Sequence, residues 1–192
     1  MNKDILVNKE NPLDKNFIPK NLIKVTLIET PKLNDKMLTY LDKEVYENFL
    51  MFRLEGLYNG INMVIDSGYR SYKYQEFILA YNLFKQGKKA YKLVALPGCS
   101  EHQTGLALDF ALIINNFYVE YFDDSLKEVK WIHENAYKYG FILRYPKGFE
   151  NITGFNYECW HLRYVGKDVS FYMHENNIRT LEEYHSLKNL RK

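Results

Sequence analysis

Apolar side chains recur every three to four residues in several stretches of the chain, which is the spacing of the buried face of a helix. We therefore expect helices over residues 43–58, 72–86, 126–139, 168–176 and 180–187. Ser71 is a suitable N-cap for the second helix and Gly87 a suitable stop. Asp123, Asp124 and Ser125 offer N-caps for the third helix.

Short apolar runs bounded by turn residues predict strands between these helices. The strands cover residues 22–25, 61–65, 106–110, 118–121, 141–143 and 160–165, whereas residues 146–154 are predicted to form a loop. Pro12, Pro19 and Pro31 punctuate an extended lead-in over residues 1–30 that we expect to wrap around the domain. The pattern indicates an α+β protein in which helices pack on one side of a small antiparallel sheet.

Composition bounds the domain organisation and the partners. A length of 192 residues with 46% apolar residues suits a single domain over residues 1–192. The net charge of +2, without a Lys/Arg tract or a clustered basic helix, argues against a nucleic acid as a partner. The sequence shows no membrane span, and the apolar run at residues 5–7 is too short for a signal peptide. We expect a cytoplasmic protein, whereas an anchor ahead of this sequence would place it in the cell envelope.

Residue types that can ligate a metal are concentrated in two short stretches, 97–109 and 158–161. Together these stretches hold two of the five histidines and both cysteines of the chain. A catalytic zinc ion takes three protein ligands from His, Asp or Glu and keeps a fourth position for water. His102, Asp109 and His161 would supply this set.

These side chains can share one ion only if the chain turns between them. Residues seven apart on a regular strand point to opposite faces, so Gly105 must redirect the chain between His102 and Asp109. Glu158 and His161 are three residues apart, which places Glu158 in a turn before the strand that carries His161. A free carboxylate in that turn could act as a general base without ligating the metal.

A structural zinc site is an alternative use of the same residues. Cys99 and His102, with Cys159 and His161, would make a closed Cys2His2 set, although the single residue between the second pair leaves little room for two ligands on one ion. Two cysteines do not make a disulfide framework, and we favour reduced thiols. His133 is predicted to lie at the surface of its helix.

Three ordered motifs carry a resemblance to a known family. They are SGYRS at residues 67–71, SxHxxGxAxD at residues 100–109 and ExWH at residues 158–161. In order and spacing they resemble the signature segments of the VanY/VanX-type zinc D-alanyl-D-alanine carboxypeptidases and dipeptidases. The likeness covers most of the chain and is greatest to the short bifunctional VanXY-type enzymes, which residues 96–99 and 181–185 also resemble.

The resemblance implies a fold and a metal centre. The fold would be the hedgehog/D,D-peptidase fold, which periodicity alone does not identify. One Zn2+ per chain would be held by His102, Asp109 and His161, because these positions match the zinc ligands of the family. Glu158 matches the catalytic base.

The resemblance also implies a substrate site. Arg70 matches the arginine that contacts the substrate and steadies the developing oxyanion, and Gln75 and Ser100 match residues that line the substrate site. Cys159 departs from the family pattern, since many relatives carry Pro at this position. It leaves the ligand set intact but places a thiol beside the metal.

The implied function is hydrolysis at the D-alanyl end of peptidoglycan precursors. The chain would be a zinc-dependent D-alanyl-D-alanine carboxypeptidase that removes the C-terminal D-Ala, with the free D-Ala-D-Ala dipeptide as a further substrate. The alternatives are an L,D-carboxypeptidase or a stem-peptide endopeptidase of the same family, or a non-catalytic, zinc-stabilised module that binds peptides. The sequence does not decide between vancomycin resistance and routine trimming of the cell wall, and it does not indicate the oligomeric state.

Overall fold

The computed structural model describes residues 2–25 and 39–190. Within them, no helix has the length and apolar character that crossing a membrane requires. The strands are β1 (Leu22–Lys24), β2 (Tyr40–Asp42), β3 (Met63–Ser67), β4 (Ala107–Ile114), β5 (Phe117–Val119), β6 (Phe141–Leu143) and β7 (His161–Tyr164). The α-helices are α1 (Lys43–Tyr58), α2 (Tyr72–Gln86), α3 (Ala90–Leu93), α4 (Lys127–Asn135), α5 (Glu150–Thr153), α6 (Lys167–Glu175) and α7 (Leu181–Leu190).

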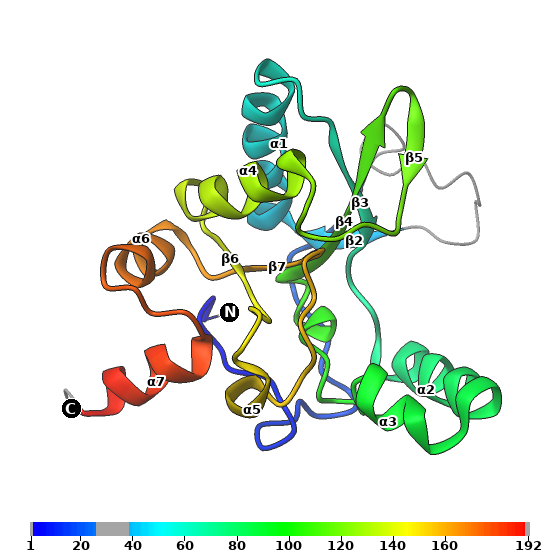
Figure 1. Ribbon diagram of the computed structural model, residues 1–192. Helices are drawn as coiled ribbons and strands as arrows, with labels where there is room; N and C mark the ends of the chain where they lie inside the picture. Colours follow the sequence, from blue (N-terminus) through cyan, green and yellow to red (C-terminus); the bar gives the residue numbers. More distant parts are fainter. Residues whose placement is uncertain (1, 26–38, 191–192) are drawn as a thin grey trace.

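The main sheet is antiparallel throughout and has the order β3-β4-β7-β6, with β5 paired to β4 (Figure 1). Its register brings distant parts of the sequence together: Asp109 on β4 lies opposite His161 on β7, and Ser67 at the end of β3 lies opposite Asp109. β1 and β2 form a separate antiparallel pair. The predicted α+β class is confirmed, and the central position of β4 sets the position of the metal-binding candidates.

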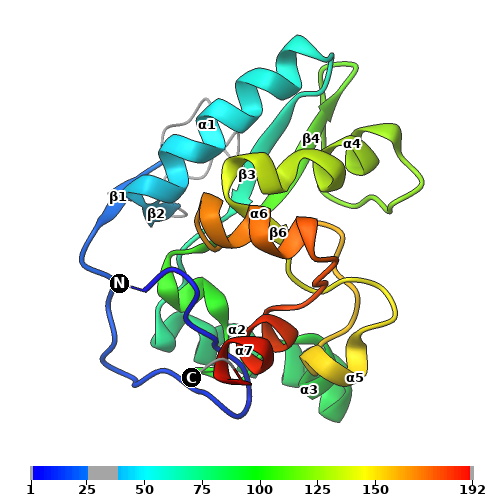
Figure 2. The same cartoon turned by 90° about the vertical axis from the view of Figure 1, so that its left-hand side faces the viewer.

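Helices α1, α4 and α6 lie over one side of this sheet (Figure 2). The core between them and the strands is aromatic: the ring of Phe52 on α1 stacks on those of Trp131, Tyr139 and Phe141. Phe52 and Phe141 are fully buried. Helices α2 and α3 lie apart from this group, at the opposite end of the molecule in Figure 1, so the prediction of helices on one side holds for α1, α4 and α6 only.

The ends of α1 and α2 follow from local capping. Asp42 accepts a hydrogen bond from the backbone N–H of Glu44 at the start of α1. Ser71 accepts one from the N–H of Tyr74, and Gly87 follows the last residue of α2. Both helices therefore have the predicted bounds.

Two local predictions are wrong. The third helix begins at Lys127 after Leu126, which makes no side-chain cap, and the Asp123 side chain instead accepts a hydrogen bond from the N–H of Ser125 in a turn. After α4 the chain continues as a 3-10 helix over Ala136–Tyr139. The predicted loop at residues 146–154 contains the short helix α5.

The first residues of the chain lie against its later elements. Val7 is fully buried, and the N–H of Leu13 donates to the carbonyl of Gly98 over 2.8 Å. The Gln103 side chain donates to the carbonyl of Asp14 over 3.0 Å. The end of the predicted lead-in, residues 26–30 and Pro31, lies outside the described residues, so the extent of the wrapping segment stays a prediction.

Alanine substitutions at two glycines allow the free-energy cost of backbone strain to be distinguished from the cost of steric crowding. Gly60 and Gly140 both have positive φ, at +75° and +86°. A Cβ on Gly60 would meet no atom within 4 Å, whereas one on Gly140 would lie 2.5 Å from the Tyr164 ring. We expect Gly60→Ala to lower the free energy of unfolding by about 1–2 kcal/mol, and Gly140→Ala by about 1–3 kcal/mol more because the buried ring must move. Urea unfolding of both variants measures the difference; equal losses would contradict the packing around Gly140.

Candidate metal centre

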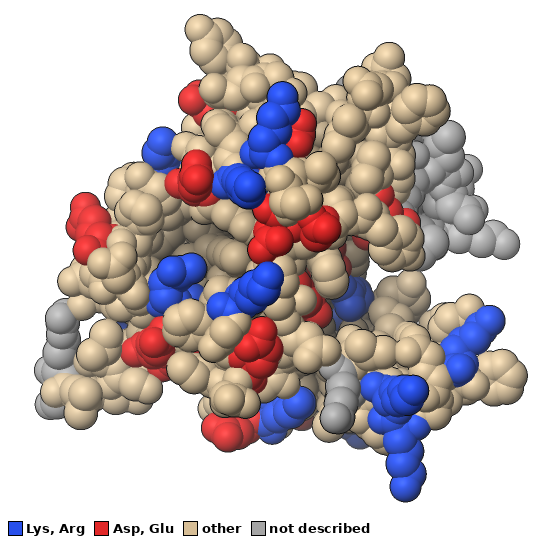
Figure 3. Space-filling model, viewed as in Figure 1, with Lys and Arg blue, Asp and Glu red and all other residues tan. Residues whose placement is uncertain are grey.

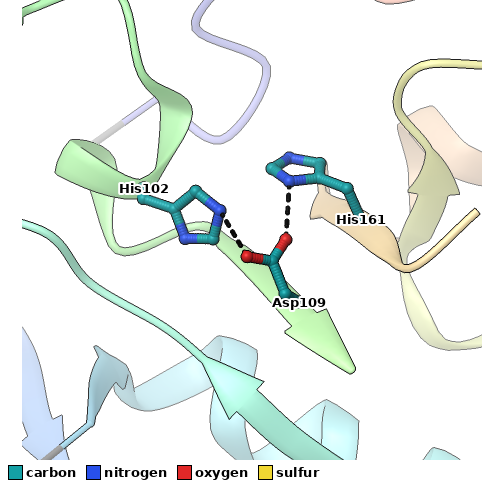
Figure 4. A group of neighbouring side chains, drawn as sticks. All are labelled: His102, Asp109 and His161. Carbon is teal, nitrogen blue, oxygen red and sulfur yellow. Dashed lines mark hydrogen bonds and ion pairs between the residues drawn. The ribbon is translucent and has the colours of Figure 1, made fainter. Parts of the chain in front are cut away.

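His102, Asp109 and His161 converge beside the paired strands β4 and β7 (Figure 4). One ligand atom from each lies within 4.8 Å of the others, and both histidines are buried. Among the residues that the structure describes, no other group of this kind is found. The structure therefore brings together the three residues that the sequence nominated.

A sharp turn before β4 makes this convergence happen. His102 lies on a 3-10 turn over Glu101–Thr104, which ends at Gly105 in the left-handed conformation, with φ +70°. The Thr104 hydroxyl accepts from the N–H of Leu106 over 2.9 Å and closes the turn. The chain then enters β4 and carries Asp109 to the same side as His102, as the sequence analysis required.

The hydrogen bonds of His102 fix which nitrogen faces the centre. Nδ1 of His102 lies 2.6 Å from the carbonyl oxygen of Gly68, so this nitrogen carries the hydrogen. The lone pair of Nε2 then points toward Asp109 Oδ2, 3.3 Å away. His161 meets the same carboxylate from the other side, with Nδ1 3.0 Å from Asp109 Oδ1.

Arg70 reaches the same acceptors. Its Nη2 lies 2.7 Å from both Asp109 Oδ2 and His102 Nε2, and its Nε donates to Ser67 Oγ. Arg70 forms an ion pair with Asp109, whereas Asp66 accepts a hydrogen bond from the hydroxyl of Tyr118. Two imidazole nitrogens and a carboxylate aimed at one point fit Zn2+. The Arg70 guanidinium would have to swing aside, because it uses lone pairs that the ion needs.

The two histidines have opposite electrostatic environments. Burial and the charge of Arg70 lower the pKa of His102 to about 4. Burial also disfavours the charged form of His161, but hydrogen bonding to Asp109 and the nearby carboxylate of Glu101 outweigh it and raise the pKa of His161 to about 9. Asp109 is the common partner, and His102, His161 and Arg70 hold its pKa well below the usual range despite burial.

Glu158 lies beside the three candidate ligands in the turn before β7. The N–H of His161 points to the carbonyl of Glu158 over 3.4 Å, and the Glu158 carboxylate lies 3.7 Å from His161 Nδ1. Burial, reinforced by the charge of Asp109, raises the pKa of Glu158 to about 7. A carboxyl group with this pKa can both accept and return a proton near neutral pH.

A cavity of about 200 Å³ opens onto these residues. Arg70, Gln75 and Ser100 all line it, together with Glu158. The Gln75 side chain donates to the carbonyl of Ala95 over 2.9 Å, which leaves its buried Oε1 without a hydrogen bond. The rest of the wall is largely apolar and is formed by Ile78, Leu93, Val94, Ala95, Tyr145, Phe155 and Trp160. All the predicted site residues therefore border one cleft, and their roles stay predictions.

The cysteines lie away from the ligand atoms. Cys99 and Cys159 are buried and free. The Cys159 thiol donates toward the carbonyl of Phe122 and belongs to the apolar core, so it is not one of the clustered ligands. The cluster contains Asp109 and neither of the two cysteines that the Cys2His2 alternative requires.

His133 was predicted to lie at the surface, which is wrong. It is partly buried, and its Nε2 lies 2.8 Å from the carbonyl oxygen of Cys159. Burial lowers the pKa of His133, which favours the neutral ring that donates this hydrogen bond. This hydrogen bond to the backbone of Cys159 holds the turn between Glu158 and His161 in place.

Sequence reasoning missed a buried ionic network behind His161. Glu101 is fully buried, and its Oε1 accepts from Arg144 Nε over 2.7 Å and from Arg163 Nη1 over 2.6 Å. Arg144 also makes two parallel hydrogen bonds to Glu182 on α7, over 2.7 and 2.8 Å. The sequence feature that could have indicated this network is an arginine in or directly after an apolar strand, as in the sequences HLRY and FILR.

Glu101 connects this network to the candidate metal ligands. Its second oxygen, Oε2, lies 3.7 Å from Nε2 of His161, which is too long for a hydrogen bond but close enough for an ion pair. Neither atom has a hydrogen-bond partner among the described residues. Burial opposes ionisation of Glu101, but the charges of Arg144 and Arg163 outweigh it and hold the pKa of this carboxyl below its usual range.

Comparison with known proteins identifies relatives of the whole chain. A family model described as VanY, D-alanyl-D-alanine carboxypeptidase, matches residues 38–167. The chain is 41% identical over 180 residues to the putative carboxypeptidase YodJ of Bacillus subtilis. It is 38% identical over 190 residues to the bifunctional D-Ala-D-Ala dipeptidase and carboxypeptidase VanXYC of Enterococcus gallinarum. These matches cover 93% and 96% of this chain; they span 65% of YodJ, which is just under two thirds, and 94% of VanXYC.

Solved structures share the fold. The LD-carboxypeptidase LdcB superposes with a TM-score of 0.83 at 39% identity, over 94% of this chain and 84% of its own. A variant of the vancomycin-resistance D,D-pentapeptidase VanY in complex with Zn(II) gives 0.78 at 28% identity, over 96% and 99%. The D,D-dipeptidase VanXYg, solved with a D-Ala-D-Ala phosphinate analogue, gives 0.78 at 34% identity, over 96% and 70%. The predicted D,D-peptidase fold is confirmed.

The buried network should dominate the stability of this region. Glu101→Gln leaves two fully buried guanidinium groups without their shared counter-charge, so we expect a loss of about 3–5 kcal/mol in the free energy of unfolding. Glu182→Gln is the matched control, because it also removes a carboxylate from Arg144, but one that is 13% exposed and not shared with Arg163. Its loss should be clearly smaller. Urea unfolding in the presence of a chelator checks this; equal losses would show that Glu101 is not the central charge.

Proposed function

The chain belongs to the VanY family of D-alanyl-D-alanine carboxypeptidases, and from this membership we propose that it is a zinc-dependent peptidase that removes the C-terminal D-Ala from peptidoglycan precursor peptides. Cleavage of the free D-Ala-D-Ala dipeptide is part of the proposal. The observation that carries it is the convergence of His102, Asp109 and His161 beside a partly buried carboxylate, Glu158, in the lining of one cleft.

The proposed cofactor is one Zn2+ per chain. His102 would contribute Nε2, His161 Nδ1 and Asp109 a carboxylate oxygen, which is the donor set of a catalytic zinc centre. The VanY relative that was solved as a Zn(II) complex supports the choice of metal. Zinc, when bound, supplies a Lewis acid that acidifies water and polarises a peptide carbonyl.

Glu158 is the proton carrier in this mechanism. Its carboxylate takes the proton of the attacking water while the new C–O bond forms at the scissile carbonyl. The same carboxyl then gives the proton to the amine of the departing D-Ala as the C–N bond breaks. Burial beside Asp109, with a pKa of about 7, suits a group that performs both transfers at neutral pH.

Arg70 and its neighbours orient the peptide. The Arg70 guanidinium lines the cleft next to Asp109, where a permanent positive charge can face the developing oxyanion or the substrate carboxylate. Ser100 lies on the same wall and offers a hydroxyl group. Gln75 lies in the same lining, where its side-chain amide donates to the carbonyl of Ala95 and helps to fix the shape of the cleft.

An L,D-carboxypeptidase is the second candidate function. The observation that favours it is the likeness to LdcB, an LD-carboxypeptidase, whose TM-score of 0.83 exceeds the 0.78 of the VanY and VanXYg structures. The two activities differ in the residue before the scissile bond and share the metal centre. A comparison of substrates therefore separates them.

Two variants test the roles at the metal centre. We expect Glu158→Ala to lower kcat by at least about 100-fold, because the proton carrier is lost, and to keep one zinc per chain. His161→Ala should lose both zinc and activity, since a ligand is removed. His174→Ala, an exposed histidine on α6, is the control and should keep both. Zinc is measured by elemental analysis after dialysis, and full activity of the Glu158 variant would remove this residue from the mechanism.

Released D-Ala identifies the substrate. The substrates are D-Ala-D-Ala, a stem pentapeptide that ends in D-Ala-D-Ala and a stem tetrapeptide whose terminal D-Ala follows an L-centre. Each is assayed with and without a chelator, and zinc is then added back. We expect release from the pentapeptide, loss with chelator and recovery with zinc. Faster release from the tetrapeptide would assign the L,D activity, and no release from any substrate by zinc-loaded protein would favour the non-catalytic peptide-binding module.

A further inference from the structure

Helix α2 carries a row of aromatic side chains on the side that faces solvent. Tyr74, Phe77, Tyr81 and Phe84 recur at helical spacing and are 41%, 64%, 53% and 87% exposed. The first three rings stack in sequence, since the ring centroids of Tyr74 and Phe77 are 6.3 Å apart and those of Phe77 and Tyr81 are 6.5 Å apart. Four aromatic residues in one exposed row are unusual for a surface that meets only water.

The rest of the described chain does not cover this row. Gln75 is the only buried residue of α2, and the helix lies apart from the main helical layer (Figure 1). The apolar surface continues past the helix, where Tyr91 is 49% and Leu93 52% exposed. We define the α2–α3 face as Tyr74, Phe77, Tyr81, Phe84, Tyr91 and Leu93.

Positive charge surrounds the α2–α3 face. Residues 72–93 hold five lysines and one glutamate, a net charge of +4 in a chain whose total is +2. Lys85 lies over the ring of Tyr81, with Nζ 5.6 Å from its centroid, and Lys88 and Lys89 follow in the next turn. Figure 3 shows Lys and Arg side chains over this end of the molecule, without acidic side chains among them on the face shown. Among charged residues, helix α2 itself holds only Lys73, Lys85 and Glu76, and the other three lysines follow it directly, at positions 88, 89 and 92.

We propose that the α2–α3 face docks the protein onto an anionic phospholipid membrane. A helix that lies in a membrane interface presents aromatic side chains to the acyl boundary and lysines to the headgroups, which is the combination found here. Tyrosine suits this boundary because its ring is apolar and its hydroxyl stays hydrated. Lysines along the same segment are attracted to the negative surface of the membrane.

Charge argues against a second copy of this chain as the occupant. In a two-fold symmetric contact through α2, the row of one protomer would face the row of the other. The contact would then place two segments of net charge +4 against each other, and like charges across an interface oppose association. An anionic membrane surface would instead attract the lysines, and its acyl boundary would contact the aromatic row.

Docking would place the cleft beside the membrane. Gln75 and Ile78 on α2, and Leu93, Val94 and Ala95 after it, form one wall of the cavity next to Arg70. The same short segment thus carries both the membrane face and one wall of the cleft, and Leu93 belongs to both. This inference does not depend on which peptide bond the cleft cleaves.

Vesicle flotation of the full chain tests the proposal. The vesicles contain phosphatidylcholine alone or an equal mixture of phosphatidylcholine and phosphatidylglycerol. We expect flotation with the anionic vesicles at about 50 mM salt, weakening toward about 500 mM salt as the lysines are screened. Phe77→Ser/Phe84→Ser and Lys85→Glu/Lys88→Glu/Lys89→Glu should each lower the bound fraction by about tenfold or more, because aromatic and charged contacts act together.

Matched variants show whether the effect belongs to this face. Phe117→Ser/Tyr121→Ser removes two aromatic side chains that are 74% and 89% exposed near β5. Lys15→Glu/Lys127→Glu/Lys130→Glu changes the net charge by the same amount at exposed positions elsewhere. Both controls should float as the unchanged protein does. All substituted side chains are exposed, so thermal unfolding should show little change.

Three results would overturn the proposal. The first is no flotation with the anionic vesicles, and the second is equal flotation with both kinds of vesicle. The third is an equal loss in a control variant, which would reduce the effect to total charge or general hydrophobicity. Light scattering adds a further check: a dimer that Phe77→Ser/Phe84→Ser converts to a monomer would assign the face to a second copy of the chain instead.

Discussion

A buried carboxylate between two buried arginines is the constraint around which this structure is arranged. Glu101 could not be fully buried and ionised alone, and neither could Arg144 or Arg163. Each charge is tolerable only while the other two stay in place. The three come from the turn before β4, the end of β6 and β7, so their mutual dependence fixes the relative positions of the segments that carry the candidate metal ligands.

The same network ties both ends of the described chain to the centre. Arg163 donates to the carbonyls of Lys3 and Ile5, and Arg144 holds Glu182 on α7. The first residues and the last helix are thus part of the support behind His161, although they are far from it in sequence. A buried second partner that orients a ligating histidine is a common requirement of metal centres, and here that support reaches the surface of the molecule.

Sequence was sufficient where one local interaction decides the outcome. The bounds of α1 and α2 follow from Asp42, Ser71 and Gly87, whose capping is written into neighbouring residues. The turn at Gly105 could also be inferred, because two residues seven apart had to face one point. The ionic network could not, since nothing in the local sequence indicates which carboxylate will meet Arg144. Helix α5 was missed for a related reason: four residues give too little periodicity for a pattern to be seen.

Helix α2 shows a further limit of periodicity. Its bounds follow from the cap at Ser71 and the stop at Gly87, but a regular apolar stripe does not say what it faces. In α1 the stripe of Val45, Phe49 and Phe52 meets the sheet, whereas in α2 the corresponding stripe meets solvent. The lysines at the end of the α2 stripe and directly after it are favourable against an anionic surface. Since the opposite side of α2 contributes Gln75 to the cleft, the helix has to satisfy two surfaces at once. That double requirement explains why a protein would keep an apolar row in contact with water.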